Sequence, residues 1–249
     1  HNIVRTSSGF FDVSHMGRLE IQYSQIEKIS NLICSELIDI PTNKALYSIF
    51  TNEEGNALDD VIFWKFDDKI ILIPNASNLD KIKSHLTTHN VEYIDKSEDT
   101  VLIAVQGPDT IDLIQERFEI PDKFSTNHTE NYLYARTGYT GEDGVEIMAN
   151  NEDADSLLTF LTEKGIKPCG LGSRDTLRLE ASLPLYGFEL TEDITPVEAS
   201  LSWTLTNKND YLGSERINKQ LSGENHKVLK KFIIDSRKIA RTETVGIAG

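Results

Sequence analysis

The same order of segments occurs three times along the chain: an apolar run of strand length, an asparagine or aspartate, and then a helical run. The apolar runs are KIILIP at 69–74, TVLIAVQ at 100–106 and GVEIMAN at 144–150. Two more β-rich runs, ALYSIF and LDDVIFWKF, flank the turn NEEGN at 52–56, which predicts a hairpin. Because hairpins separate the strand–helix units, we predict a layered α+β domain rather than alternating units around a parallel sheet.

The N-terminal part adds two expected features. FFDVSHMG at 10–17 and the residues after it read as a pair of strands. Alternation along this run separates His15 from Asp12 and Ser14, so these three residues are not expected to form a catalytic triad. Apolar residues at helical spacing predict one amphipathic helix over 25–39.

The C-terminal part is polar and rich in loop-forming residues. It predicts a linker, a short helix over about 214–221 and then a strand, KKFIID, at 230–235. We therefore expect one domain over 1–206, with a boundary near Asn207, and the start of a second domain in 207–249.

Composition excludes several classes of protein. Lys plus Arg number 25 and Asp plus Glu number 40, which gives a formal charge of −15. A field of this sign repels nucleic acids and anionic membranes, and no apolar run approaches the roughly 20 residues of a membrane helix. Cys34 and Cys169 lie far apart and outside any Cys/His cluster, so we expect reduced thiols in a reducing compartment and no structural zinc site. We expect a cytoplasmic location, and the resemblance described below would imply the mitochondrial matrix in a eukaryote.

A glycine-rich bend precedes an acid that lies within an apolar strand. Gly138, Gly141 and Gly144 recur every third residue, which is typical of turns that need positive φ. The strand that starts at Gly144 places Val145 on one face and Glu146 on the other. Glu146 either points to solvent at a sheet edge or reads a ligand.

Asp59 and Asp60 begin the second strand of the predicted hairpin and point to opposite faces. Asp59 shares its face with Phe63, and Asp60 shares its face with Trp64. Both faces are apolar, so at least one carboxylate is desolvated, and its pKa rises unless a partner compensates. Periodicity alone does not decide which aspartate is functional and which one caps the turn.

A third acid–base feature follows at 170–187. Ser173 is a candidate N-cap for a helix that carries Arg174 and Arg178 four residues apart, on one face. Two like charges so placed need an acid opposite them. Asp175 and Glu180 on the same helix are one possibility, and a distant acid such as Glu146 is another.

Several blocks of the chain resemble one family in the family's order. These are FFDVSHMG, NEEGNALDDVIFW, GYTGEDGVEI, GLGSRDTLRLEASLPLYG and ITPVEASLSWTL, which extend over about 4–213. Together they resemble the tetrahydrofolate-dependent aminomethyltransferases, the T-proteins of the glycine cleavage system. That resemblance implies a folate-binding domain of interlocked β-α-β repeats followed by a C-terminal β-barrel. Family members are longer at both ends, so the chain is expected to be a fragment.

The resemblance also implies roles for particular residues. Asp59 corresponds to the acid beside the reacting folate nitrogens. Glu146 would accept two donors from the pterin edge, and Arg174 would hold Glu146 or the ligand. The remaining implied folate-binding residues are Met16, Asn75 and Tyr139, although Met16 alone reads as a core methionine and Asn75 alone as a capping residue.

The implied reaction moves a one-carbon unit from an aminomethyl-dihydrolipoyl carrier protein, the H-protein, to tetrahydrofolate and releases ammonia. No metal is implied. Two alternatives remain: another folate-dependent transferase or demethylase on the same fold, and a non-enzymatic folate-binding protein of iron–sulfur maintenance. The latter family carries a cysteine in a KGCYTGQE-like segment, whereas this chain has RTGYTGE at 136–142 and no cysteine there, which favours the enzyme.

Overall fold

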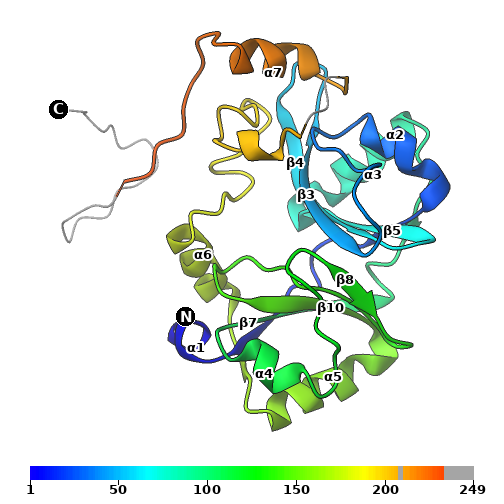
Figure 1. Cartoon of the computed structure of the whole chain (residues 1–249), viewed down its shortest axis with the longest axis vertical. Helices are drawn as coiled ribbons and strands as arrows, with labels where there is room; N and C mark the ends of the chain where they lie inside the picture. Colours follow the sequence, from blue (N-terminus) through cyan, green and yellow to red (C-terminus); the bar gives the residue numbers. More distant parts are fainter. Residues whose placement is uncertain (207–209, 233–249) are drawn as a thin grey trace.

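The computed structural model of the chain describes residues 1–206 and 210–232 and contains two β-sheets that face each other (Figure 1). The six-stranded sheet contains, in spatial order, β11 (Lys167–Pro168), β1 (Gly9–Asp12), β7 (Thr100–Gln106), β10 (Gly144–Asn150), β9 (Tyr132–Ala135) and β8 (Thr126–His128). The five-stranded sheet contains β3 (Lys44–Thr51), β4 (Ala57–Lys65), β5 (Lys69–Ile73), β2 (Leu19–Gln22) and β6 (Ile94–Asp95). Neighbouring strands are antiparallel, except that β1 and β11 run parallel.

Helices cover the sheet faces that are turned away from each other (Figure 1). On the five-stranded sheet these are α2 (Ile26–Ser30) and α3 (Leu79–Thr88), and on the six-stranded sheet they are α4 (Thr110–Ile114) and α5 (Asn151–Glu163). The other helices and 3₁₀ turns are α1 (Asn2–Thr6), α6 (Leu171–Glu180), α7 (Ser214–Leu221), η1 (Tyr23–Gln25), η2 (Ala76–Asn78) and η3 (Ser202–Thr204). The layer order of helix, sheet, sheet and helix confirms the predicted α+β class.

Strand alternation decides which side chains enter the core between the two sheets. Trp64 and Ile71 enter it from the five-stranded sheet, and Leu102 and Met148 enter it from the six-stranded sheet. The alternate residue Phe63 packs instead under α2 and α3. Burying one such side chain stabilises the fold by about 1.5–3 kcal/mol. This shared core therefore holds the two sheets against each other.

The predicted hairpin and the three predicted strand–helix units are present. The hairpin pairs β3 with β4, with Ile49 opposite Asp60 and an irregularity of register between Phe50 and Thr51. The units are β5–α3–β6, β7–α4–β8 and β10–α5–β11. Gly55 has a φ of +77° in the NEEGN turn, a conformation that glycine adopts without strain.

Two N-terminal predictions were wrong. The helix predicted over 25–39 ends at Ser30, because the backbone beyond it pairs with β3: Cys34 donates its N–H to the Ile49 carbonyl at 3.0 Å. The FFDVSHMG strand ends at Asp12, whose carboxylate accepts the Ser14 N–H at 2.9 Å in a local turn. The strand that follows belongs to the other sheet, so β1 and β2 are not a pair.

The predicted C-terminal helix is confirmed over Ser214–Leu221, where Ile217 is buried in a cluster with Tyr211 and Ile49. Of the predicted strand at 230–235, residues 230–232 are not in a strand and the rest lie outside the described residues. The boundary residue Asn207 also lies outside them. No helix in the described part of the chain is long and apolar enough to cross a membrane.

Candidate functional site

Asp59 lies near the start of β4 and is fully buried, with 0 % of the residue exposed. Its Oδ1 accepts hydrogen bonds from the side-chain amides of Asn75 (2.8 Å) and Asn78 (2.5 Å), and its Oδ2 accepts the backbone N–H of Asn75 (3.0 Å). Burial and the charge of Asp60 raise the pKa of Asp59 to about 7, although the three hydrogen bonds act in the opposite direction. Asp59 is therefore an acid that titrates near neutral pH.

Asp60 is half-buried and has its own partners. Its Oδ2 accepts a hydrogen bond from the Tyr47 hydroxyl at 3.0 Å, and its Oδ1 accepts one from the side-chain amide of Asn75 at 2.9 Å. Burial raises the pKa of Asp60, and these hydrogen bonds lower it. The two aspartates thus share the Asn75 amide and form one coupled acid pair.

The structure decides which face each aspartate occupies. Asp60 alternates with Trp64 on the face of β4 that lines the core between the two sheets. Asp59 alternates with Phe63 on the opposite face, under α3. Asp60, and not Asp59, is therefore turned toward the six-stranded sheet.

Asn75 follows β5 and opens η2. Its side chain does not cap that turn. Instead, Nδ2 donates to both aspartates and to the Asp60 carbonyl oxygen at 2.9 Å. The capping alternative for Asn75 is therefore wrong, and the residue joins the acid pair.

Glu146 lies in β10, which runs between β7 and β9 inside the six-stranded sheet. It is 6 % exposed, so the alternative that it points to solvent at a sheet edge is wrong. It alternates with Met148, on the face that lines the core between the sheets. Its Oε2 accepts a hydrogen bond from the Thr137 hydroxyl at 2.6 Å. A buried carboxylate with so few protein donors is suited to accept hydrogen bonds from a ligand.

Arg174 on α6 faces Glu146, with 3.9 Å between Nη2 and Oε1. Its guanidinium carbon lies 4.9 Å from the centre of the Tyr139 ring, which is a cation–π contact. Burial lowers the pKa of Arg174, and the charge of Glu146 opposes that shift. Nη1 of Arg174 is buried and has no hydrogen-bond partner in the protein, so the site retains an unsatisfied donor.

The alternative in which Asp175 and Glu180 pair with the two arginines of α6 is only partly correct. Asp175 does satisfy an arginine, because Arg178 lies 2.8 Å from it and 2.8 Å from Glu189. Glu180 instead pairs with Arg5 at 2.9 Å. The long-range pairing of Arg174 is therefore the one that the structure contains.

The predicted N-cap of α6 was wrong. The helix begins at Leu171 with Gly170 as its N-cap, and the Ser173 hydroxyl donates back to the Gly170 carbonyl at 2.7 Å. Gly170 is extended, with a ψ of 153°, so the helix starts earlier and Ser173 falls in its first turn.

Tyr139 connects the two halves of the site. Burial and the charge of Asp60 raise the pKa of its hydroxyl. Its ring lies under Arg174, and its hydroxyl donates a hydrogen bond to the Pro184 carbonyl. Tyr139, Arg174 and Glu146 are thus joined by direct contacts, and Asp60 acts on Tyr139 through its charge. These four residues, from both sheets, α6 and the bend before β10, are called the cluster below.

The segment predicted to lie beside the ligand borders this cluster. His15 is exposed as a whole residue. Partial desolvation of its ring and the charge of Arg174 lower its pKa. Met16 is half-buried and packs against the core between the sheets. Its predicted contact with a ligand stays a prediction.

Sequence reasoning left Asp60 open beside Asp59 until the resemblance favoured Asp59, and it assigned no role to Tyr47 or Trp203. The Tyr47 and Trp203 rings stack at 5.4 Å between centroids with 19° between their planes, and Trp203 remains 64 % exposed. An exposed tryptophan fixed on a tyrosine that binds Asp60 offers an aromatic surface at the edge of the cluster. The only hint in the sequence was the position of Trp203 within the resembling block LSWTL.

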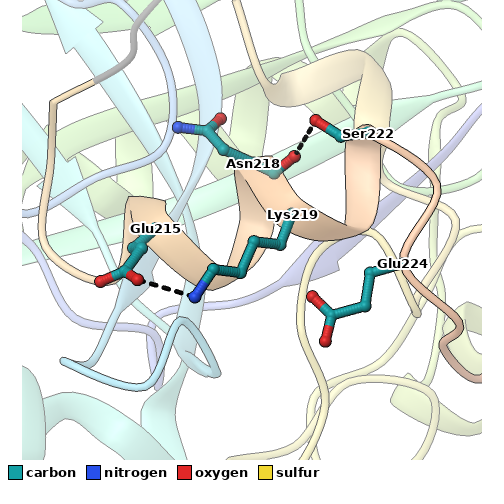
Figure 2. Close-up of a pocket in the computed structure, with 5 residues that line it drawn as sticks. All are labelled: Glu215, Asn218, Lys219, Ser222 and Glu224. Atoms are coloured by element: carbon teal, nitrogen blue, oxygen red, sulfur yellow. Dashed lines mark hydrogen bonds and ion pairs between the residues drawn. The ribbon is translucent and has the colours of Figure 1, made fainter.

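Other surface features lie apart from these residues. A hollow of about 430 Å³ on α7 is lined by Glu215, Asn218, Lys219, Ser222 and Glu224, where Lys219 and Glu215 form an ion pair at 2.7 Å (Figure 2). None of the cluster residues lines it. Within the described residues, no three His, Cys, Asp or Glu side chains are grouped so as to hold a metal ion.

The chain and its fold match a class of folate-dependent transferases. The family model described as the GCVT N-terminal domain matches residues 1–209. The aminomethyltransferase of Prochlorococcus marinus is 36 % identical over 97 % of this chain, and that of Synechococcus elongatus is 38 % identical over 97 %. The chain therefore belongs to the aminomethyltransferase family of the glycine cleavage system.

A solved structure of the same family supports this assignment. The crystal structure of the glycine cleavage system aminomethyltransferase T from Bartonella henselae matches 89 % of this chain with a TM-score of 0.83 and 27 % identity. The chain spans 65 % of that protein, and it spans 72 % and 70 % of the Prochlorococcus and Synechococcus proteins.

Proposed function

We propose that this chain carries the aminomethyl transfer of glycine cleavage. A one-carbon unit passes from the aminomethyl-dihydrolipoyl carrier protein to tetrahydrofolate, and ammonia is released. The observation that supports this most strongly is that Asp60 and Glu146 lie on the facing sides of two different sheets, with Arg174 and Tyr139 beside Glu146. Tetrahydrofolate supplies the nucleophilic nitrogens.

Glu146 and Arg174 are suited to hold the pterin ring. The pterin edge offers two parallel N–H donors and a carbonyl oxygen, and a carboxylate beside a guanidinium complements this pattern. Oε1 of Glu146 is 3.9 Å from Arg174, too far for a hydrogen bond, and Nη1 of Arg174 is a buried donor without a partner. Folate would satisfy both, and its binding would offset the cost of burying them.

The aspartate pair is proposed to carry the chemistry. The resemblance assigned the reacting position to Asp59, but a residue with 0 % exposure under α3 does not touch a substrate without a rearrangement. We therefore assign the contact with the reacting carbon and nitrogen to Asp60, and we assign to Asp59 the role of an electrostatic neighbour that shares the Asn75 amide. A carboxylate at this place stabilises positive charge that develops as ammonia leaves, and it accepts or returns a proton.

The remaining predicted residues have positioning roles in this proposal. Asn75 orients both carboxylates through one amide. The Tyr139 ring holds the guanidinium of Arg174 through their cation–π contact. Met16, at the edge of the core between the sheets, is proposed to contact the pterin. The exposed Trp203 provides a stacking surface for the flat aminobenzoyl part of folate.

Family membership supports proposals about the partner and the location. The donor is proposed to be the lipoylated carrier protein of glycine cleavage, and residues 207–249 are proposed to start a C-terminal β-barrel domain, separate from a folate-binding domain of interlocked repeats at 1–206. The named relatives are bacterial and both cysteines are free, which supports a cytoplasmic location.

Calorimetric titration with tetrahydrofolate, followed by reconstitution with an aminomethylated lipoyl carrier, tests the proposal. Saturable folate binding together with stoichiometric ammonia and methylene-tetrahydrofolate would support it. Folate binding without ammonia release, combined with turnover of a methyl or methylamine donor, would instead assign the chain to another folate-dependent transferase.

A further inference from the structure

One hydrogen bond orients the carboxylate of Glu146. Its Oε2 accepts the Thr137 hydroxyl at 2.6 Å, and Thr137 is itself 6 % exposed. Arg174 lies 3.9 Å away, so it attracts the carboxylate without a hydrogen bond that would set the direction of its oxygens. A glutamate has three side-chain torsions, and β10 fixes only its backbone. Thr137 therefore determines where the carboxylate points.

Thr137 is not part of a strand, and its own position depends on Gln106. It lies in the bend between β9 and β10. Gln106, the last residue of β7, is fully buried, and its Nε2 donates to the Thr137 carbonyl at 3.1 Å. Its Oε1 accepts the Thr140 hydroxyl at 3.0 Å. One side-chain amide thus holds both arms of the bend.

The glycines of the bend make room for this amide. A Cβ placed on Gly138 would lie 1.8 Å from Oε1 of Gln106, and a Cβ on Gly144 would lie 2.1 Å from the Val105 carbonyl oxygen and 2.6 Å from Nε2 of Gln106. Of the three glycines in the bend, only Gly141 has a positive φ, at +82°. The predicted reason for the spacing, a need for positive φ, is therefore wrong at Gly138 and Gly144. Those two glycines permit close approach of the Gln106 side chain.

We infer that Gln106 and Thr137 are positioning residues that set the Glu146 carboxylate for its ligand, so that the end of β7 controls folate recognition from a site that folate does not touch. This inference rests on the proposed function, since it takes Glu146 as the group that reads the pterin edge. It predicts a loss of folate affinity with little change in turnover at saturating folate, because the aspartate pair is untouched.

Calorimetric titration of tetrahydrofolate into four variants tests the inference. Thr137→Val removes the hydroxyl and keeps the shape, and it should weaken folate binding about tenfold or more. Thr137→Ser keeps the hydroxyl and should bind as the wild type does. Thr110→Val is the matched control, because Thr110 is fully buried and its hydroxyl bonds to Ser8 at 2.6 Å, outside the cluster. It should lower the unfolding midpoint and leave folate affinity unchanged.

The fourth variant, Glu146→Gln, separates the inference from the function on which it rests. Wild-type protein that binds no folate would remove the proposed function itself. If Glu146→Gln weakens binding and Thr137→Val does not, the function stands and the positioning role is excluded. In the Glu146→Gln background, Thr137→Val should have no further effect on folate affinity. Fully additive losses in the double variant would also overturn the inference.

Discussion

Asp60 and Glu146 lie on different β-sheets, on the two faces that are turned toward each other. Asp60 alternates with Trp64 and Glu146 alternates with Met148, and both of these neighbours pack in the core between the sheets. Two acids in a shared, mostly apolar space are costly unless each has partners. Asp60 has Tyr47 and Asn75, whereas Glu146 has Thr137 and, at longer range, Arg174. Carboxylate oxygens with so few protein donors can accept further hydrogen bonds from a ligand.

Asp60→Asn should lower kcat by about 10²- to 10³-fold, because it removes the negative charge that faces the reacting atoms. Folate affinity should change by less than about threefold, since Glu146 and Arg174 are unaltered. Steady-state turnover with a lipoylated carrier and a folate titration measure the two quantities. Asp59→Asn is the comparison, and its loss should be smaller. A larger loss in Asp59→Asn than in Asp60→Asn would restore Asp59 as the reacting acid.

The stability of the protein should depend on pH through Asp59. Its pKa is raised from 3.8 to about 7 in the folded state, so between these values the folded chain holds a proton that the unfolded chain has released. The free energy of unfolding therefore falls as pH rises from about 4 to 7, with a contribution of up to about 1.4 kcal/mol per pH unit, and then levels off.

Urea unfolding across this pH range, compared between wild type and Asp59→Asn, isolates that contribution from other titrating groups. Asp60→Asn should lower the pH at which the fall in stability levels off, because the charge of Asp60 is one cause of the raised pKa of Asp59. An unchanged difference between wild type and Asp59→Asn from pH 4 to pH 7 would contradict the assignment.

Arg174→Lys should weaken tetrahydrofolate binding about tenfold or more. A lysine lacks the planar fork that spans Glu146 and the ligand, and it loses part of the stacking on Tyr139. Calorimetry gives the dissociation constant. Arg117→Lys is a matched control, because Arg117 also stacks on a tyrosine, with its guanidinium carbon 5.1 Å from the Tyr132 ring centre. Equal losses of folate affinity in Arg174→Lys and Arg117→Lys would indicate a general effect on folding.

The local parts of this structure were predictable from sequence because they depend on near neighbours. The NEEGN hairpin, the start of β10 at Gly144 and the bounds of α7 all follow from turn residues and apolar periodicity. The helix expected over 25–39 failed because its end depends on β3, a distant partner: the Cys34 backbone pairs with Ile49. Periodicity does not contain that competition between local helix and long-range strand pairing.

The candidate site was only partly predictable for the same reason. Alternation correctly separates Asp59 from Asp60, but both faces of β4 are apolar in sequence, so only the position of the second sheet shows that Asp60 is the one turned toward it. The glycine pattern marked the bend, yet at Gly138 its cause is the amide of Gln106, more than thirty residues earlier in the chain. Residue types indicated the candidate residues, and long-range packing decided which of them lie near one another.

Arg18→Met should destabilise the fold by about 3 kcal/mol or more. Arg18 is fully buried, and its guanidinium donates to the carbonyl oxygens of Ser14, Met16, Ser97 and Thr100, which would lose their partner. Urea unfolding measures the change in the free energy of unfolding.

A control for the loss of an arginine is Arg216→Met, whose side chain is 41 % exposed. Its effect should stay within about 1 kcal/mol. If Arg18→Met were no more destabilising than this control, the buried guanidinium would not be what joins the segment 14–18 to the turn at 97–100.

Gly138→Ala should destabilise the protein and weaken folate binding together, because the new methyl group would meet the Gln106 amide at 1.8 Å and displace the bend that carries Thr137. Gly172→Ala provides the matched substitution. Gly172 lies in α6, a Cβ there meets nothing within 4 Å, and alanine favours the helix by up to about 1 kcal/mol. The unfolding midpoint should therefore fall in Gly138→Ala and rise or stay unchanged in Gly172→Ala. Folate titration should show weaker binding only in Gly138→Ala. Wild-type folate affinity in Gly138→Ala would mean that the bend tolerates displacement of the amide, and that Glu146 is oriented by its strand alone.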